Sequence, residues 1–188
     1  MTIRVVTILG TSRPGNFTAR ALALVEDELR SREAEVVRID PAGHELVFPG
    51  EGEGDGDALK ALVQSATGIV FATPEYHGTM AAKAKLIIEN LGFPSALSAK
   101  PIALLGVAAG AIGAIKSLEQ LRGTLSHTGA IVLPGTVSVA GVQRLFDAEG
   151  KCTDERVEKR IRGVATSLID YLEQSVCPRL TLEQMVRE

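Results

Sequence analysis

Short apolar runs alternate along the chain with segments in which apolar residues recur at helical spacing. The run over residues 3–9 is rich in β-branched residues and stops at Gly10, and the run over residues 68–73 is ended by Pro74, which is typical of buried strands. The amphipathic segments run for ten residues or more, which is typical of helices that bury one face. The pattern predicts five strands, over residues 3–9, 35–39, 68–73, 101–108 and 130–139. It predicts five helices, over residues 18–31, 57–66, 81–91, 113–127 and 154–175.

Strands that alternate with helices of this length predict parallel pairing through right-handed crossovers. The inner runs are apolar on both faces, as a sheet covered by helices on both sides requires. Five such strands predict a three-layer α/β fold, a doubly wound parallel sheet with the flavodoxin-like order 2-1-3-4-5. No linker or internal repeat divides the chain, so we expect one domain over residues 1–188. The acidic, glycine-rich residues 49–57 predict a flexible, solvated loop.

Composition narrows the class of protein. The 188 residues include 20 Lys plus Arg and 23 Asp plus Glu, and this formal charge of −3 argues against a nucleic-acid-binding protein. The longest uncharged apolar stretch is shorter than the roughly 20 residues of a membrane-spanning helix, and no secretion leader is evident. We therefore expect a cytoplasmic protein without a membrane span. Two cysteines, Cys152 and Cys177, are too few for a disulfide framework or a four-thiolate zinc site, and we expect no metal.

The predicted topology indicates where a ligand binds. In an open parallel sheet, ligands lie beyond the carboxyl ends of the strands, near the point where the strand order reverses. The loops that follow the first, third and fourth strands meet at that edge, and they comprise residues 10–17, 74–79 and 108–113. Candidate ligand-binding residues should therefore fall in these three loops.

The first loop has the composition of an anion site. It joins a strand to a helix start and offers small polar side chains with one arginine, at Thr11, Ser12, Arg13, Asn16 and Thr18. The free N–H groups of the first helical turn point at the same place. The loop lacks the Lys-Ser/Thr pair of a nucleoside-triphosphate loop and the G-x-G-x-x-G spacing of a dinucleotide site. The loop therefore suits a compact monophosphate better than a di- or triphosphate. We also favour a phosphate site here over a polar turn without a ligand.

The other two loops are suited to a flat ligand. The second places Tyr76 and His77 at the end of a buried strand, where packing alone does not explain them. A hydrogen-bonding role without proton transfer fits His77 equally well, and a helix-capping charge fits Glu75 equally well. The third loop is made of small residues, so a ligand can approach its backbone, although a tight strand-to-helix turn has the same composition.

The three loops carry a family resemblance. The segments Gly10-Thr-Ser-Arg-Pro-Gly-Asn16 and Pro74-Glu-Tyr-His-Gly78, followed by residues 109–113 and Leu118-Glu-Gln-Leu-Arg122, resemble the NADPH-dependent FMN reductase family. This family has a flavodoxin-like fold and includes azo, quinone and chromate reductases. The likeness spans about residues 3–172. The family commonly has Asn where His77 stands and Ser where Thr79 stands.

The resemblance implies a redox function. Hydride would pass from NADPH or NADH to FMN, and from the flavin to an acceptor such as a quinone, an azo compound, chromate or free flavin. The first loop would hold the FMN phosphate, the second would line the isoalloxazine ring and ribityl chain, and the third would close the other side. The flavin carries the hydride chemistry, so no catalytic side chain is expected. The implied cofactor-binding residues are Thr11, Ser12, Arg13, Asn16, Phe17, Thr18, Pro74, Glu75, Tyr76, His77, Gly78, Ala109, Gly110 and Gly113.

Two other functions fit the same loops, namely a flavodoxin-type electron carrier and a phosphate-ligand-binding protein without a redox role. Flavodoxins are usually more acidic than this chain and lack an arginine in the phosphate loop, which favours the reductase. The chain has five Phe, two Tyr and no Trp. Tyr76 is the one aromatic residue that we expect to contact the flavin ring.

The helix predicted over residues 81–91 bears on the oligomeric state. It carries Leu86, Ile87, Ile88 and Leu91 beside a thin polar face, which favours a helix that buries one side in its own core and another on a partner subunit; the alternative is a well-buried helix in a monomer. Members of the family are commonly dimers or tetramers. We therefore expect a homodimer or homotetramer that acts on a small-molecule acceptor.

Overall fold

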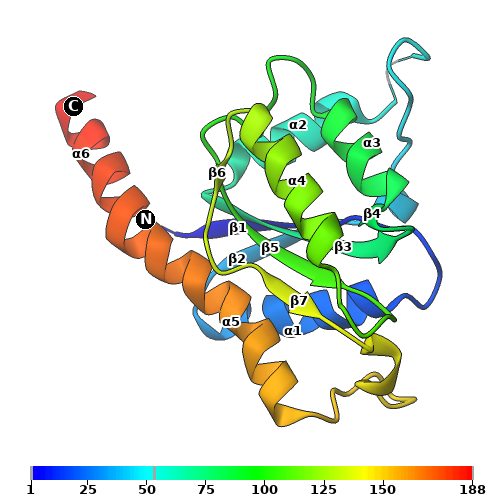
Figure 1. The fold of residues 1–188 in the computed structure, drawn as a ribbon. Coiled ribbons are helices and arrows are strands. Elements are labelled where there is room, and N and C mark those ends of the chain that lie inside the picture. The colour runs from blue at the N-terminus through cyan, green and yellow to red at the C-terminus, as the bar shows by residue number, and fades with distance from the viewer. Residues whose placement is uncertain (1, 53, 188) are drawn as a thin grey trace.

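The computed structural model describes residues 2–52 and 54–187. Its central sheet has four long parallel strands, β1 (Arg4–Leu9), β2 (Glu35–Ile39), β3 (Gly68–Tyr76) and β5 (Pro101–Val107). The strand order is β2-β1-β3-β5-β6 (Figure 1). The element β4 (Thr79–Met80) is a short hairpin arm, antiparallel to the end of β3. The parallel strands alone thus follow the predicted order 2-1-3-4-5, which confirms the flavodoxin-like fold.

The fifth predicted strand is interrupted. It consists of β6 (Ile131–Val132) and β7 (Val137–Val139), which pair in parallel with the beginning and the end of β5. Between them lie Pro134, which has no N–H to donate, and Gly135, which has a φ of 76°. The prediction of one continuous strand is therefore wrong, because these two residues cannot continue a sheet ladder.

Helices cover both faces of the sheet (Figure 1). One face carries α1 and α5, and the other carries α2, α3 and α4. The alternation of side chains along a strand divides the core in the same way: Val5 and Leu9 of β1 pack with the first group, and Val6 and Ile8 pack with the second. The helices are α1 (Phe17–Ser31), α2 (Gly56–Ser65), α3 (Ala82–Asn90), α4 (Ile115–His127) and α5 (Glu155–Tyr171), with short 3-10 turns η1 (Pro41–Gly43) and η2 (Val142–Arg144).

The large apolar side chains of α3 are buried within the chain's own fold. Leu86, Ile87 and Ile88, together with Leu91 at the end of the helix, are buried. Ile87, Ile88 and Leu91 belong to the core cluster between α3 and the sheet. The prediction that α3 offers a second apolar surface to a partner subunit is therefore wrong, because this helix is short and its neighbours enclose it on several sides.

The last helix extends beyond its predicted end at Ser175. A π-turn, η3 (Leu172–Val176), joins α5 to a further helix, α6 (Cys177–Arg187). The Cys177 N–H bonds to the Leu172 carbonyl five residues earlier, and this wider turn accommodates Pro178, which cannot donate to the helix ladder. The sequence pattern missed α6 because proline usually stops a helix. Although this arm is long, no helix among the described residues is both long and apolar enough to cross a membrane.

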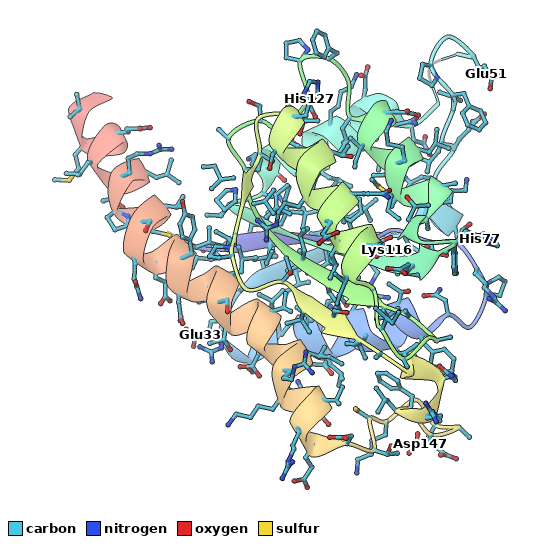
Figure 2. The ribbon with its side chains drawn as sticks, in the orientation of Figure 1. Glu33, Glu51, His77, Lys116, His127 and Asp147 are labelled. Atoms are coloured by element: carbon cyan, nitrogen blue, oxygen red, sulfur yellow. The ribbon has the colours of Figure 1, made fainter. Side chains whose placement is uncertain are left out.

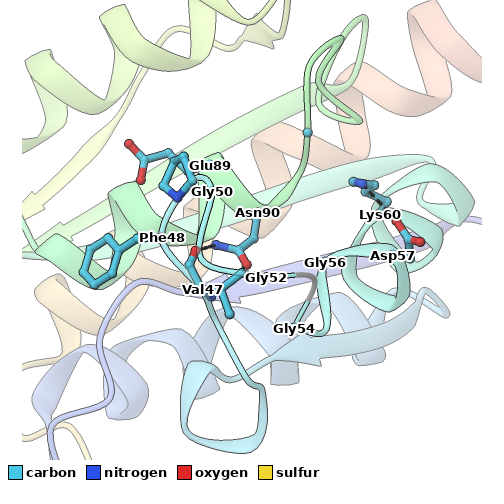
Figure 3. Close-up of a pocket in the computed structure, with 12 residues that line it drawn as sticks. Val47, Phe48, Gly50, Gly52, Gly54, Gly56, Asp57, Lys60, Glu89 and Asn90 are labelled. Carbon is cyan, nitrogen blue, oxygen red and sulfur yellow. Dashed lines mark hydrogen bonds and ion pairs between the residues drawn. The ribbon is translucent and has the colours of Figure 1, made fainter.

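The acidic loop at residues 49–57 is exposed over most of its described length, and Glu53 lies outside the described residues. It is nevertheless anchored on its N-terminal side. Asn90 of α3 donates to the Val47 carbonyl at 2.9 Å and accepts from the Val47 N–H at 3.1 Å. Figure 3 shows this clamp beside a cavity of about 370 Å³ between the loop and the end of α3.

Candidate functional site

A cleft of about 460 Å³ opens at the carboxyl edge of the sheet. This volume lies within the range of small-molecule and cofactor sites. Four chain segments line the cleft: the loop that leads into α1, the end of β3, the end of β5 and the segment after β7. Eight of the predicted residues line it, namely Arg13, Asn16, Phe17, Thr18, Pro74, Glu75, Tyr76 and Ala109.

The sequence analysis missed one wall of the cleft. Val142 and Gln143, which follow β7, line it, and the Gln143 side-chain amide donates to the Ala109 carbonyl at 3.2 Å. The Val142 N–H bonds to the Ala108 carbonyl at 3.1 Å, which ties this segment to the third loop. The predicted topology could have indicated this wall, because the fifth strand ends at the same edge of the sheet as the three loops. The other lining residues are Pro14, Gly15 and Ala108, which belong to the predicted loops although they were not among the named binding residues, and Val107 at the end of β5.

The first loop is shaped by its own side chains. Asn16 is the N-cap of α1: its Oδ1 accepts the Ala19 N–H at 2.7 Å, while its Nδ2 donates to the Arg13 carbonyl at 2.8 Å. Thr11 Oγ1 accepts the Arg13 N–H at 3.3 Å. These bonds hold the loop against the helix start, so Asn16 acts chiefly as a cap. The N–H groups of Phe17 and Thr18, in the first turn, have no carbonyl partner within their own helix.

An anion would meet favourable charge at this end of the cleft. The start of α1 carries the positive end of the helix dipole. Arg13 lies exposed at the rim, where its guanidinium is free to move onto a ligand. Thr18 is almost fully buried beneath the same turn, and Ser12 is half-buried beside it. This combination of amides, hydroxyls and one guanidinium suits a phosphate monoester.

The second loop is attached to α4 by two side chains. Glu75 Oε2 accepts the Ser117 N–H at 3.1 Å, in the first turn of α4. The Thr79 hydroxyl bonds to the Gln120 side chain. The helix-capping interpretation of Glu75 is therefore the one that its geometry supports, because its carboxylate sits at the positive end of a helix. Both contacts fix the β3–β4 hairpin relative to the third loop.

His77 and Gly78 form the tip of this hairpin. Their φ values are 52° and 75°, and Tyr76 pairs with Thr79 across the two-residue turn. This is the geometry of a type I′ turn, which requires positive φ at both central positions. The His77 side chain is exposed, and its label in Figure 2 lies at the edge of the molecule. The turn by itself accounts for a residue that tolerates positive φ at this position.

Replacing His77 with asparagine should leave the free energy of unfolding unchanged or raise it by up to about 0.5 kcal/mol, because asparagine adopts positive φ more readily. Replacing it with valine should lower the free energy of unfolding by about 1–3 kcal/mol, because a β-branched residue is strained there. Urea denaturation measures both effects. Loss of catalytic activity in a stable His77→Asn protein would contradict the structural role and assign the imidazole to the reaction.

Two aromatic residues line the cleft. The Tyr76 side chain reaches from the second loop to the first, where its hydroxyl lies 3.4 Å from Thr11 Oγ1. Phe17 packs on Phe146, with ring centroids 6.2 Å apart, and the Arg20 guanidinium lies 5.1 Å from the centre of the Phe17 ring. Phe17 therefore supports the segment after β7, whereas the Tyr76 ring remains available to a ligand.

The remaining predicted residues lie behind or beside the cleft wall. Thr11 is buried under Tyr76, and Gly110 is exposed. Gly113 has a φ of 79°, and a Cβ atom there would lie 2.4 Å from Ser138 Oγ, so glycine is required for packing. The predicted residues outside the cleft lining are Thr11, Ser12, His77, Gly78, Gly110 and Gly113. Contact with a ligand stays a prediction for all fourteen residues, including the eight that line the cleft.

The residues of the cleft fit FMN. The amides and hydroxyls at the start of α1 suit its phosphate, while Ala108 and Ala109 leave the backbone open to a flat ring opposite the end of β3. Within residues 2–52 and 54–187, no group of three or more His, Cys, Asp or Glu side chains is placed to hold a metal ion.

Known proteins resemble this chain both in sequence and in fold. An NAD(P)H-dependent FMN reductase of Pseudomonas aeruginosa, PA1204, is 29% identical over 167 residues, which cover 85% of this chain and 90% of that protein. An NAD(P)H:quinone oxidoreductase of Solanum tuberosum is 27% identical over 176 residues, 88% of this chain and 91% of that protein. The solved structure of FerB, a flavoenzyme NAD(P)H:(acceptor) oxidoreductase from Paracoccus denitrificans, has the same fold, with a TM-score of 0.76 at 20% identity over 92% of this chain and 98% of FerB.

A family model extends this likeness to the cleft itself. The model of the NADPH-dependent FMN reductase family matches residues 3–144. This range includes every segment that lines the cleft, from the loop before α1 to Gln143 after β7. By this match over most of its length, the chain belongs to the NADPH-dependent FMN reductase family.

Proposed function

We propose that the protein binds FMN in the cleft at the carboxyl edge of the sheet and oxidises NADPH or NADH to reduce a small-molecule acceptor. A quinone, an azo compound, chromate or free flavin is the expected class of acceptor. The observation that carries the proposal is the position of the α1 start, with its free N–H groups and Arg13, at one end of a cleft of about 460 Å³ that the small residues Ala108 and Ala109 also line. FMN supplies the hydride-accepting and hydride-donating chemistry when it is bound.

The phosphate end is the more strongly specified part of the proposed site. The first-turn N–H groups of α1 would bind phosphate oxygens, and the Ser12 and Thr18 hydroxyls would add neutral hydrogen bonds. Arg13 would close over the phosphate from the rim with a charge-assisted hydrogen bond. Asn16 holds this loop in shape through its two bonds to the backbone. Binding is therefore expected to discriminate strongly for the phosphate group.

At the other end of the proposed site, the flavin ring would be held by backbone groups and by the shape of the cleft. The isoalloxazine ring would lie between residues 74–78 and the pair Ala108–Ala109, with Tyr76 as its aromatic neighbour. Backbone N–H groups of the Tyr76–Gly78 turn would stabilise negative charge that develops on the pyrimidine side of the ring. The Glu75 and Thr79 contacts to α4 hold this turn in position. The protein would thereby tune the flavin without a dedicated acid or base.

The setting of the enzyme is also a proposal. We propose that it acts in the cytoplasm, where NADPH and NADH are available, and that it binds no nucleic acid, in keeping with its charge of −3. We propose a homodimer or homotetramer. The buried side chains of α3 do not support this, but exposed apolar residues elsewhere do, including Phe93 and Ile112, which are 100% and 75% exposed.

A spectrum and a turnover assay test the function. The purified protein, supplied with FMN and freed of excess, should show bound-flavin absorbance and should oxidise NADPH or NADH over many turnovers once a quinone is added. Free FMN at the same concentration is the control. Bound flavin without NAD(P)H oxidation would indicate an electron carrier instead. Absence of flavin binding would leave a phosphate-ligand-binding protein and would refute the proposal.

A further inference from the structure

The helix at the end of the chain presents an apolar stripe to solvent. On α6, Pro178, Leu182, Met185 and Val186 recur at the i, i+4, i+7 and i+8 spacing, which places them on one side of a helix. Leu182, Met185 and Val186 are 63%, 68% and 86% exposed. Figure 1 shows α6, in red, extending past the end of the sheet. The stripe thus lacks the cover that the apolar face of α5 receives.

The π-turn between α5 and α6 explains the direction of this stripe. The apolar side of α5 and the start of η3, including Ile161, Leu168 and Leu172, face the core. A π-turn adds one residue to the helical repeat, which rotates the following residues by about 100° around the helix. Val176 and Cys177 are the last side chains against the core, and no described residue after Cys177 belongs to either core cluster. The stripe of α6 is therefore turned away from the body of its own chain.

The exposed stripe of α6 gains burial only from a partner. The backbone of α6 continues the helix of α5 through η3 and needs no nucleation of its own, but Leu182, Met185 and Val186 bury little apolar surface against their own chain. We propose that the stripe of α6 packs against the α6 stripe of a second copy of this chain, with the two helices antiparallel. This inference deepens the homo-oligomer proposed above by naming its contact, and it does not require the flavin.

The charges beside the stripe favour a second copy as the occupant. Arg179 and Glu183 lie on one flank of α6, one turn apart, with an N···O distance of 3.6 Å. In an antiparallel pair each flank faces its own equivalent on the other helix. A two-fold axis near Thr181 would place Arg179 of each copy opposite Glu183 of the other. The flank is therefore complementary to itself, as an isologous contact requires.

The same charges argue against a membrane as the occupant. Residues 177–188 contain two Arg and two Glu, so their formal charges cancel. Helices that lie on anionic membranes are typically rich in Lys and Arg on the polar face. A contact confined to the three turns of α6 is expected to bury less than the roughly 1,200 Å² of stable interfaces, so we expect a reversible dimer with a dissociation constant in the micromolar range.

Analytical ultracentrifugation of the full chain tests the pairing. The wild type should shift from the 19.9 kDa monomer to a dimer as its concentration rises from about 1 to about 500 µM. Leu182→Glu should raise the dissociation constant at least tenfold, because it brings two carboxylates into the contact. Ser167→Glu, which adds the same charge at an exposed position of α5, is the matched control and should leave dimerisation unchanged. FMN binding, measured in parallel, should be the same for all three proteins.

Charge reversal tests the antiparallel arrangement. Arg179→Glu should weaken the dimer, and Arg179→Glu combined with Glu183→Arg should restore it, because the double variant is again complementary to itself. A wild type that stays monomeric, or a Leu182→Glu protein that dimerises like the wild type, overturns the proposal. So does failure of the double variant to recover. Co-sedimentation of the wild type with phosphatidylcholine–phosphatidylserine vesicles, lost in Leu182→Glu, would also overturn it, while failure of flavin binding would refute only the proposed function.

Discussion

Replacing Arg13 with alanine is expected to raise the dissociation constant of FMN by ten- to a hundredfold. A hydrogen bond between a guanidinium and a phosphate contributes about 1.5–3 kcal/mol, and 1.4 kcal/mol corresponds to a factor of ten in affinity. Arg13 lies at the rim of the cleft, next to the start of α1, and it is the one arginine of the first loop. Titration of the apoprotein with FMN, followed by quenching of flavin fluorescence, measures the change.

Two comparisons separate this effect from a general loss of structure. Arg32→Ala removes an arginine at the other end of α1 and should leave FMN affinity unchanged. Riboflavin, which has no phosphate, should bind wild type and Arg13→Ala with similar affinity. Arg13→Lys should fall between alanine and wild type, because lysine keeps the charge but not the planar fork. Equal FMN affinity in folded Arg13→Ala and wild type would remove Arg13 from the phosphate site.

Replacing Glu26 with alanine is expected to lower the free energy of unfolding by about 3 kcal/mol. The Glu26 carboxylate on α1 is almost fully buried and accepts two hydrogen bonds from Arg38 of β2, both at 2.7 Å. The buried Thr7 hydroxyl of β1 donates to it at 2.6 Å. Alanine would leave an arginine and a hydroxyl without their partner, and breaking a buried pair costs about 3–5 kcal/mol. The lower end applies because the Arg38 side chain is 29% exposed and can regain water.

Glu28→Ala is the matched control on the same helix. Glu28 pairs with Arg32 at 2.8 Å, but this contact lies at the surface, and such pairs contribute about 1 kcal/mol or less. Urea denaturation of both variants without flavin gives the two free energies. If Glu26→Ala costs no more than Glu28→Ala, the network that joins β1, β2 and α1 does not stabilise the fold as its burial suggests.

The fold was largely predictable because each element carries its own periodic signal. The run before Gly10 is apolar on both faces, and the segment from Thr18 to Ser31 repeats at helical spacing, so strand and helix are distinct. The errors fall where one residue changes local geometry. Pro134 interrupts the fifth strand, and Pro178 is accommodated by a π-turn that lets a helix continue.

The cleft was predictable to the extent that topology brings strand ends to one edge. The loops around Arg13 and Tyr76 lie where the strand order places them. Val142 and Gln143 were not predicted to line the cleft because their place there depends on the end of β7. The capping roles of Asn16 and Glu75 depend on distances that no sequence spacing specifies.

The sequence by itself determined the fold class, the strand order and three of the loops that line the cleft, because hydrophobic period and turn residues are local properties of the chain. Only the tertiary structure decided which apolar side chains remain exposed to solvent. It enclosed the apolar residues of α3 within the chain's own core and turned those of α6 to solvent, although both patterns look amphipathic in sequence. The reason is physical: whether an apolar face is covered depends on neighbours that are distant in sequence, and a single added residue in a helix rotates the face that follows.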